Sequence, residues 1–417
     1  MKPGGKRRRE TQGRKVAKAQ RSVGKHQFRM VYSEGSARVR NILALGILFA
    51  GSTWGPCAAD CSAAEPALSE VISPVPYQVV QREGHDPRRA GPHEPGGAQL
   101  GYADVPVEVN WPAGALKDSP KIEARVEPLA GAFGSGTDWA ALAGELREGE
   151  QKWLAKLRIP AGGWYRLSVR VRRGDETLAT ASVEPFGVGE VFVVAGQSYA
   201  VGANDELMKV DDPAGRVVAY DMLKRTWQVA NDPQPNAGDG GTIWPTTGNF
   251  LLPIAQVPIG FVNVAVGGTA SRQWLPGERL YENLAAAGKA IGRFRAVLWQ
   301  QGESDVIEHR STAYYISNLT KIRASLAAEW GFEPPWLLAK STLHPTVYND
   351  PEGEARIRTA IDELCQQPGF RPGPDTDLLT GENRGGLGTR RHFSGIGQRR
   401  AGQMWFAAIW GELARSQ

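Results

Sequence analysis

The chain has 417 residues, which is too long for one average domain, and its 41% of hydrophobic residues is enough for two ordinary cores. Residues 1–40 carry thirteen Lys or Arg against two acids, a local charge of +11, so the overall +5 leaves the remaining residues at −6. The excess of basic residues therefore lies in residues 1–40, and it does not indicate that the rest of the protein binds nucleic acid.

Residues 1–64 have the layout of a secretory signal peptide with an extended basic region. An apolar run at 41–54 follows the basic residues, and small residues lead up to Ala64, near which we expect cleavage. The run is too short for a stable membrane helix, and an uncleaved anchor is the alternative. Met30 would give a signal of ordinary length and is the expected start. The mature protein is then periplasmic or secreted, without a membrane span.

The chain has three cysteines, and two of them, Cys57 and Cys61, would leave with the signal. Cys365 would then be the only one, so no internal disulfide is expected. It lies at helical spacing with Ile361 and Leu364, which predicts a buried, inert thiol. The histidines are scattered, without metal-ligand spacing, and we predict neither a catalytic metal nor a cofactor.

Residues 65–100 are rich in Pro, Gly and polar residues and are interpreted as a linker. Residues 101–187 alternate between apolar and polar residues in short runs separated by turns, which predicts a small β-sandwich-like domain. The tryptophans of this domain would allow it to bind sugar, but we favour a packing role beside a catalytic domain. The alternating runs are 105–111, 121–126, 153–159, 164–171 and 177–183.

From residue 188 to the end of the chain, apolar runs typical of buried strands alternate with helix-period stretches. This alternation predicts an α/β fold with a parallel sheet covered on both faces. The loop at 367–389 is long for a structureless connection, which favours a role in lining a cleft. The expected strands are 190–195, 260–266, 295–299 and 335–340, and the expected helices are 278–291, 313–330, 355–366 and 395–413.

Chemically versatile residues follow three of these strands. Gly196-Gln197-Ser198 follows the first, Gly267-Gly268-Thr269 the second, and the run Gln300–Asp305 the third. Parallel strands place their carboxyl ends at one edge of the sheet, where a single crevice collects such residues. His392 precedes the last helix. Each feature has a structural alternative, such as a helix cap, a turn, a solvated helix start or a loop residue. Together they supply a nucleophile, a base, an acid and oxyanion donors for acyl transfer.

Four blocks of the chain resemble the SGNH (GDSL-like) hydrolases, in the branch of sialate O-acetylesterases and acetylxylan esterases. The segment AGQSYAVG is similar to the first block of that branch, VAVGGTASRQW to the second, VLWQQGESD to the third and RHFSGIGQ to the last. GTIWP, before the second block, and the β-domain with GWYRL also fit the branch. The resemblance covers roughly residues 160–412 and implies an SGNH-type three-layer fold at 188–417.

The resemblance implies a role for each matching residue. Ser198 would be the nucleophile and His392 the general base. The backbone N–H groups of Ser198 and Gly268 would bind the oxyanion, joined by the side chain of Gln301. Gln197 would contact substrate. Trp244 and Trp274 lie where walls of a sugar cleft are expected, with structural packing as the alternative.

The sequence departs from the family pattern at two positions. Tyr199 stands where the branch prefers asparagine, and Thr389 stands where the wider superfamily has an aspartate three residues before the histidine. A threonine cannot stabilise an imidazolium as a carboxylate does. Glu303 is therefore the first candidate for the triad acid and Asp305 the second, with a dyad that lacks a carboxylate as the third possibility.

The resulting hypothesis is an exported serine esterase that removes O-acetyl groups from a carbohydrate, without metal or cofactor. Sialic acid, xylan and other acetylated glycans are all candidate substrates, and the oligomeric state is open. A catalytically inactive carbohydrate-binding protein of the same fold is the alternative, favoured by the changes at Tyr199 and Thr389. An enzyme acting on lipid esters ranks last, because the sequence shows no long apolar lid.

Overall fold

The computed structural model describes residues 70–86, 100–110, 121–236, 238–345, 348–385 and 390–415. The predicted signal, with Cys57 and Cys61, lies outside the described residues, as does Thr389. All the described residues belong to one compact unit that spans Ala63–Gln417.

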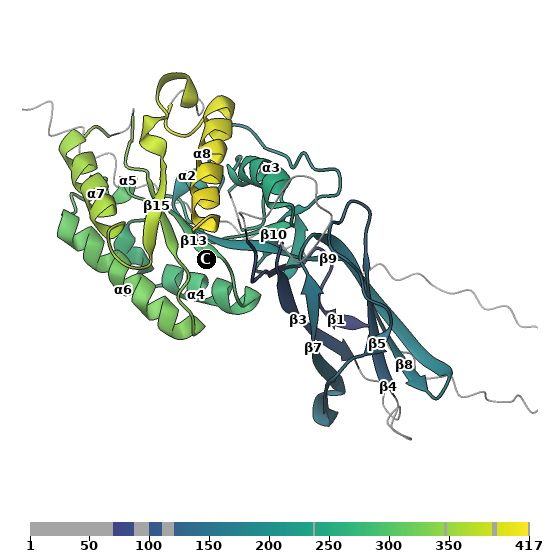
Figure 1. Cartoon of the computed structure of the whole chain (residues 1–417). Helices are drawn as coiled ribbons and strands as arrows, with labels where there is room; N and C mark the ends of the chain where they lie inside the picture. Colours follow the sequence, from purple (N-terminus) through teal and green to yellow (C-terminus); the bar gives the residue numbers. More distant parts are fainter. Residues whose placement is uncertain are drawn as a thin grey trace, which may run out of the picture. The chain divides into compact units, whose positions relative to one another are not determined.

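Two β-sheets form the first part of this unit (Figure 1). Alternate residues of their strands, among them Val105, Val107 and Val109, are buried and build the core between the sheets. The first sheet has the antiparallel order β1 (Val71–Ser73), β3 (Tyr102–Asn110), β7 (Lys152–Pro160) and β6 (Gly144–Arg147). The second consists of β5 (Ala140–Ala141), β4 (Lys121–Pro128), β8 (Gly163–Arg173) and β9 (Glu176–Gly196), with β2 (Val79–Gln81) parallel to β9.

Two features of this part differ from the sequence interpretation. The segment 65–100 was interpreted as a linker, but it contributes strands β1 and β2. The expected boundary at residues 187 and 188 falls inside the continuous strand β9, which runs from the first part into the middle of the α/β sheet. The short strands were missed because three residues are too few to show an alternating pattern.

The α/β architecture predicted for residues 188–417 is confirmed. The strand order of its sheet is β11 (Thr226–Val229), β10 (Val217–Asp221), β12 (Ile259–Asn263), β9, β13 (Ala296–Gln300), β14 (Trp336–Lys340) and β15 (Phe370–Asp375). The sheet is parallel except for the edge strand β11, and β9 lies at its centre.

Helices cover both faces of this sheet (Figure 1). The helices are α3 (Trp244–Ala255), α4 (Arg279–Ile291), α6 (Thr312–Trp330), α7 (Pro351–Leu364) and α8 (Gly395–Leu413), with the short α2 (Ser198–Val201) and α5 (Glu303–Ile307) at strand ends. The side chains of β9 alternate between the two faces. Phe192 and Val194 join the core under α3 and α8, whereas Val191 and Val193 join the core under α4, α6 and α7. Single 3₁₀ turns occur at Glu148–Glu150, Ser271–Trp274, Thr376–Leu378 and Gly381–Asn383.

A buried ion network fixes the amino-terminal end of the central part of β9. The Glu190 carboxylate accepts from Arg82 Nε at 2.7 Å and from Arg295 Nε at 2.7 Å, and Gln81 Nε2 donates to it at 2.9 Å. Burial disfavours the charged carboxylate, but the two guanidinium groups outweigh this and lower the pKa of Glu190 to about 2. The network ties β2 and the start of β13 to the same strand.

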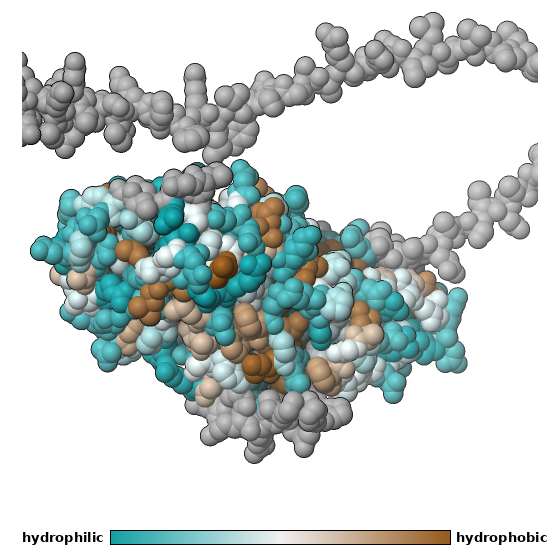
Figure 2. Space-filling view, turned by 90° about the horizontal axis from the view of Figure 1, so that it is seen from above, coloured by the Kyte–Doolittle hydropathy of each residue, from teal (hydrophilic) through white to brown (hydrophobic). Residues whose placement is uncertain are grey.

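The surface is mixed in character. On the face shown in Figure 2, hydrophobic residues are interspersed among hydrophilic ones. Within the described ranges, no helix combines the length and apolar character needed to traverse a bilayer.

Candidate active site

Ser198 lies at the carboxyl end of the central strand, on a turn that only glycine can form. Gly196 has φ +133°, and a Cβ placed on it would lie 2.1 Å from the carbonyl oxygen of Gln300 on the neighbouring strand β13. Gln197 precedes α2, and Ser198 is its first residue. The serine is partly exposed, whereas Gln197 and Tyr199 on either side are buried. The turn therefore presents one hydroxyl from an otherwise buried edge.

The second glycine pair lies beside this serine. A Cβ on Gly267 would be 3.9 Å from the Cβ of Ser198, and a Cβ on Gly268, which has φ +70°, would have no atom within 4 Å. Within the described part of the chain, neither the backbone N–H of Ser198 nor that of Gly268 donates to another protein group. Two backbone donors are thus free next to the serine hydroxyl, as an oxyanion hole requires.

Gln301 and Gln197 connect the first and third blocks. The amide of Gln301 donates to Thr269 O at 3.1 Å, to Asp305 Oδ2 at 2.7 Å and to Gln197 Oε1 at 3.3 Å. These acceptors occupy the amide hydrogens of Gln301, so the geometry does not support its expected part in the oxyanion hole. Gln197 is buried and also accepts from the N–H of Ser304 at 3.3 Å, which makes it a structural link rather than a substrate contact.

Asp305 holds the second block in place. Its carboxylate accepts from the Ser271 N–H at 2.7 Å, from the Ser271 hydroxyl at 2.6 Å and from Gln301. Burial raises the pKa of Asp305 in spite of these bonds. With its oxygens engaged in this way, Asp305 anchors the turn at Ser271–Trp274 and is poorly placed to act as a triad acid.

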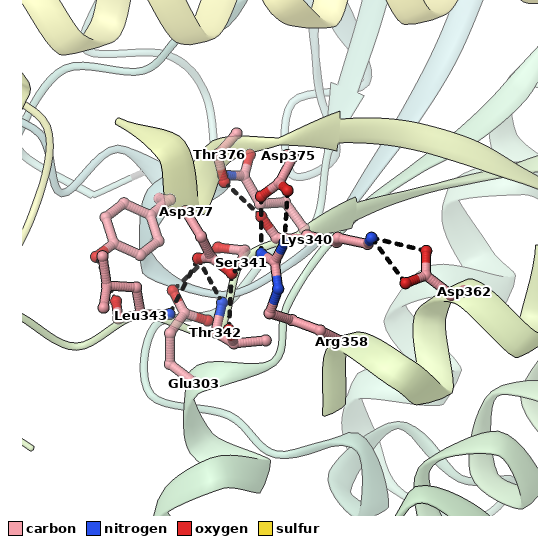
Figure 3. Close-up of polar contacts among 12 residues, drawn as sticks. Glu303, Lys340, Ser341, Thr342, Leu343, Arg358, Asp362, Asp375, Thr376 and Asp377 are labelled. Atoms are coloured by element: carbon pink, nitrogen blue, oxygen red, sulfur yellow. Dashed lines mark hydrogen bonds and ion pairs between the residues drawn. The ribbon is translucent and has the colours of Figure 1, made fainter. Parts of the chain in front are cut away.

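Glu303, the first candidate for the triad acid, makes fewer hydrogen bonds than Asp305. It is completely buried at the start of α5; Oε1 accepts from the Ser341 hydroxyl at 3.2 Å, and Oε2 has no hydrogen-bond partner among the described residues (Figure 3). Burial raises the pKa of Glu303 to about 8, the charge of Asp377 acts in the same direction, and Arg384 opposes it. Glu303 is therefore protonated at neutral pH in this state, with one free oxygen.

The imidazole of His392 packs edge-on against the ring of Tyr199, the residue after Ser198, with ring centroids 5.4 Å apart. Its Nε2 is buried and has no hydrogen-bond partner in the described ranges. Burial lowers the pKa of His392 to about 4, Arg391 and Arg384 contribute in the same direction, and Asp205 opposes them. The ring is therefore neutral at neutral pH.

No hydrogen bond joins His392 to Ser198, Glu303 or Asp305 among the described residues. The structure brings the serine, the glycine pair and both acids to one sheet edge, and it places the histidine against the serine's neighbour. It does not show the completed proton path that the resemblance implies. Catalytic hydrogen bonds are often long in the absence of substrate and tighten in the reacting complex.

The two tryptophans expected to line a sugar cleft are fully buried. The indole of Trp244 donates to Ala200 O at 2.9 Å, and that of Trp274 donates to the Thr269 hydroxyl at 3.2 Å. Trp244 therefore supports the backbone behind the first block, and Trp274 holds the Thr269 side chain of the second block. This corrects the cleft-wall expectation in favour of its structural alternative.

A second histidine at this edge was not singled out from the sequence. Nε2 of His344 lies 3.2 Å from the guanidinium of Arg391, which can only donate, so Nδ1 carries the hydrogen. That Nδ1 is buried without a partner among the described residues. Burial, Arg391 and the nearby His392 lower the pKa of His344 to about 4. The sequence feature that could have indicated His344 is its position four residues after the end of the expected strand 335–340.

The end of β15 holds the loop that carries His344. Asp377 accepts from the N–H groups of Thr342 at 2.8 Å and Leu343 at 3.0 Å, and Arg358 from α7 donates to both Asp375 and Asp377 (Figure 3). Part of the segment 367–389, expected as a loop, thus forms β15 and supports this edge.

In the described part of the chain, no three His, Cys, Asp or Glu side chains are grouped so that they could hold a metal ion. Cys365 is a free thiol at the end of α7, partly buried, and burial raises its pKa to about 11. Its surroundings are those of an inert thiol rather than of a nucleophile.

Comparison with known families gives a match to residues 188–410, more than half of the chain. The matching family is described as "Carbohydrate esterase, sialic acid-specific acetylesterase". A probable carbohydrate esterase of Arabidopsis thaliana is 39% identical over a span that covers 34% of this chain and 64% of that protein. The chain thus matches slightly less than two thirds of this relative.

The first of two comparisons with solved structures shows the same fold. The crystal structure of a carbohydrate acetylesterase from Xanthomonas citri aligns with 82% of this chain and 74% of its own, with a TM-score of 0.53 and 17% sequence identity. The structure of an Arabidopsis thaliana protein covers 54% of this chain and 98% of its own, with a TM-score of 0.44 and 20% identity.

Proposed function

The chain belongs to the carbohydrate esterases described as sialic acid-specific acetylesterases, in the SGNH hydrolase superfamily, and from this premise we propose that it is a serine esterase that removes O-acetyl groups from a carbohydrate. The observation that carries the proposal is the partly exposed Ser198 hydroxyl beside two unused backbone donors, its own N–H and that of Gly268. Such a pair favours a reaction in which negative charge develops on an acyl oxygen.

The proposed reaction is a two-step acyl transfer. The Ser198 oxygen attacks the acetyl carbonyl carbon while His392 accepts the hydroxyl proton, and the carbonyl oxygen becomes an oxyanion bound by the N–H groups of Ser198 and Gly268. When the tetrahedral intermediate collapses, the bond to the sugar oxygen breaks and His392 returns the proton to that oxygen. Water then attacks the acetyl-serine in the same way, and acetate leaves.

Glu303 is proposed as the acid that supports His392. Its buried, unpaired Oε2 lies at the same sheet edge as the serine, whereas the oxygens of Asp305 are engaged with Ser271 and Gln301. Ionised Glu303 would stabilise the imidazolium that forms when His392 takes the serine proton.

A carbohydrate-binding protein without esterase activity is the second candidate. The observation that favours it is the lack of a hydrogen-bonded carboxylate on His392 within the described ranges. Such a protein would bind acetylated glycan and leave the acetyl groups in place.

Acetate release separates the two candidates. The purified protein is incubated with a panel of acetylated glycans, including acetylated sialosides and acetylated xylan, and acetate is measured enzymatically. We expect release from at least one glycan and none from a Ser198→Ala variant with an unchanged melting temperature. Equal release by wild type and variant would overturn the assignment of Ser198, and glycan binding without acetate would support the binding protein.

Export is a separate part of the proposal. It rests on the basic, apolar and small-residue layout of residues 1–64. Mass spectrometry of the protein from its native host should find a mature terminus near Ala64, and peptides from residues 1–29 would contradict a start at Met30.

A further inference from the structure

Tyr199 takes the place of the branch's asparagine, and its phenol is fully engaged. The hydroxyl donates to Arg391 O at 2.6 Å and accepts from a guanidinium nitrogen of Arg384. Burial raises the pKa of Tyr199, so the phenol stays protonated and remains a donor. The ring packs against His392 and, with centroids 4.7 Å apart, against Phe393. One side chain thus holds the backbone before His392 and contacts the imidazole itself.

Arg384 connects this tyrosine to the end of β15. It is buried; Nε donates to Leu379 O, and Nη2 donates to Thr376 O at 3.2 Å. Its guanidinium carbon lies 5.0 Å from the centroid of the Tyr199 ring and 4.8 Å from that of Phe393. Arg384 therefore joins fixed backbone on one side to the histidine segment on the other, through donors that lysine could not arrange in the same fork.

The backbone of the histidine segment is held independently of any carboxylate. The N–H of Gly385 donates to His392 O at 2.9 Å, and the N–H of Phe393 donates to the Asn204 side chain at 3.1 Å. The Asn204 amide in turn donates to Tyr199 O at 3.1 Å. At the residue before His392, the carbonyl oxygen of Arg391 accepts from Tyr199 and, at 3.3 Å, from Arg384, while the Arg391 side chain contacts His344.

We propose that Tyr199 and Arg384 form a clamp that positions His392 for catalysis, in a chain that has threonine at the position where the wider superfamily has its aspartate. The clamp acts through the carbonyl of Arg391 and through the face that Tyr199 presents to the imidazole, so both residues are positioning residues. This inference rests on the proposed function, in which His392 is the base.

The clamp is tested with Tyr199→Phe, which removes the hydroxyl and keeps the ring. The matched control is Tyr165→Phe, which removes another buried hydroxyl, bonded to Pro160 O at 2.7 Å in the β-sandwich-like part. For p-nitrophenyl acetate we expect kcat to fall about 10- to 100-fold in Tyr199→Phe at nearly unchanged KM, because a misplaced catalytic group costs rate rather than binding. Tyr165→Phe should keep its kcat.

A histidine NMR titration gives a readout that loss of stability alone would not change. The charged groups facing His392 are Arg391, Arg384 and Asp205, with His344 beside it. Tyr199→Phe keeps all of them, so the pKa of His392 should stay low while its ring resonances shift and broaden. Assignment uses the signal that disappears in His392→Gln. If Tyr199→Phe fails to fold, Arg384→Lys takes its place with the same expected loss of kcat.

The outcomes separate the clamp from the proposed function. A kcat of Tyr199→Phe within twofold of wild type, with Ser198→Ala inactive, would overturn the clamp and leave the esterase intact. If the wild type releases no acetate, the proposed function fails, and the catalytic role of the clamp fails with it. If the wild type releases acetate, unchanged His392 resonances in Tyr199→Phe would also overturn the clamp.

Discussion

Replacing Glu303 by Gln separates the stability and the activity of one buried carboxyl group. The folded state raises the pKa of Glu303 to about 8 from its ordinary value of 4.5. Between these values the unfolded chain ionises and the folded chain stays protonated. The stability that the protonated carboxyl contributes is therefore present below pH 4.5 and is lost as pH rises through 8. At about 1.4 kcal/mol for each pKa unit, the full loss is about 5 kcal/mol.

A glutamine at this position would keep the shape of the side chain without an ionisable proton, so the variant should escape this loss. Urea unfolding of wild type and Glu303→Gln at intervals from pH 5 to pH 9 gives the free energies of unfolding directly. Between pH 5 and pH 9, we expect the free energy of unfolding of the wild type to fall by several kcal/mol relative to that of the variant. A difference that does not change with pH would refute the argument that burial raises this pKa.

The same substitution, which should make the protein relatively more stable at high pH, should lower its esterase activity. If ionised Glu303 stabilises the His392 imidazolium, kcat/KM of the wild type for p-nitrophenyl acetate rises with pH toward 8. Glu303→Gln should be slower by orders of magnitude, as loss of an orienting carboxylate is in other triads, and should lack that rise. A wild-type profile that is flat above pH 5 would instead indicate a dyad governed by His392, whose pKa is about 4.

Asp305→Asn is the matched control, because Asp305 lies two residues away and is also buried. Its three accepted hydrogen bonds hold Ser271 and Gln301, so the amide should destabilise the fold and keep the rise of kcat/KM near pH 8. Loss of that rise in Asp305→Asn alone would identify Asp305 as the acid.

Three further predictions concern residues around the site and the sheet. Gly196→Ala should abolish activity and lower the melting temperature, because its Cβ would lie 2.1 Å from Gln300 O; a variant with wild-type acetate release would contradict this. Glu190→Gln should lower the free energy of unfolding, measured with urea at pH 7, by about 3–5 kcal/mol, since the substitution leaves Arg82 buried without its charge partner. The stability that ionised Glu190 contributes is present above pH 4.5 and is lost as pH falls toward 2. The difference in free energy of unfolding between variant and wild type should therefore become smaller in acid. Cys365, with its pKa raised to about 11, should react with iodoacetamide much more slowly at pH 8 than a peptide thiol, and rapid labelling in peptide mapping would contradict the raised pKa.

The longer helices could be predicted from the sequence because their apolar residues recur at helical spacing without interruption. The expected helices 278–291 and 395–413 correspond to α4 and α8 to within a residue. Helix α3 was missed because Pro245 and Pro253 lie within its span, and β15 was missed because proline and glycine alternate through it. In both cases tertiary packing overrides a local preference against the element.

The site was accessible in part, for a different reason. The placement of Ser198 and the pair Gly267-Gly268 at one sheet edge could be predicted because parallel strands end at one edge, which is a property of the fold. For Gln301 and Trp244 the sequence could not decide between a role at the site and structural packing, because only the folded chain shows which hydrogen bonds their side chains already make. The partners of Tyr199 at Arg384 and Arg391 are far away in the sequence, and no local pattern indicates them.

The most direct test of the central proposal is covalent labelling of Ser198. The wild-type protein is treated with a fluorophosphonate probe, and the adduct is located by peptide mass spectrometry. We predict one adduct for each chain, on Ser198, with esterase activity lost in proportion to labelling and neither effect in Ser198→Ala. A protein that releases acetate while Ser198 stays unlabelled, or that carries the adduct on another residue, would contradict the account.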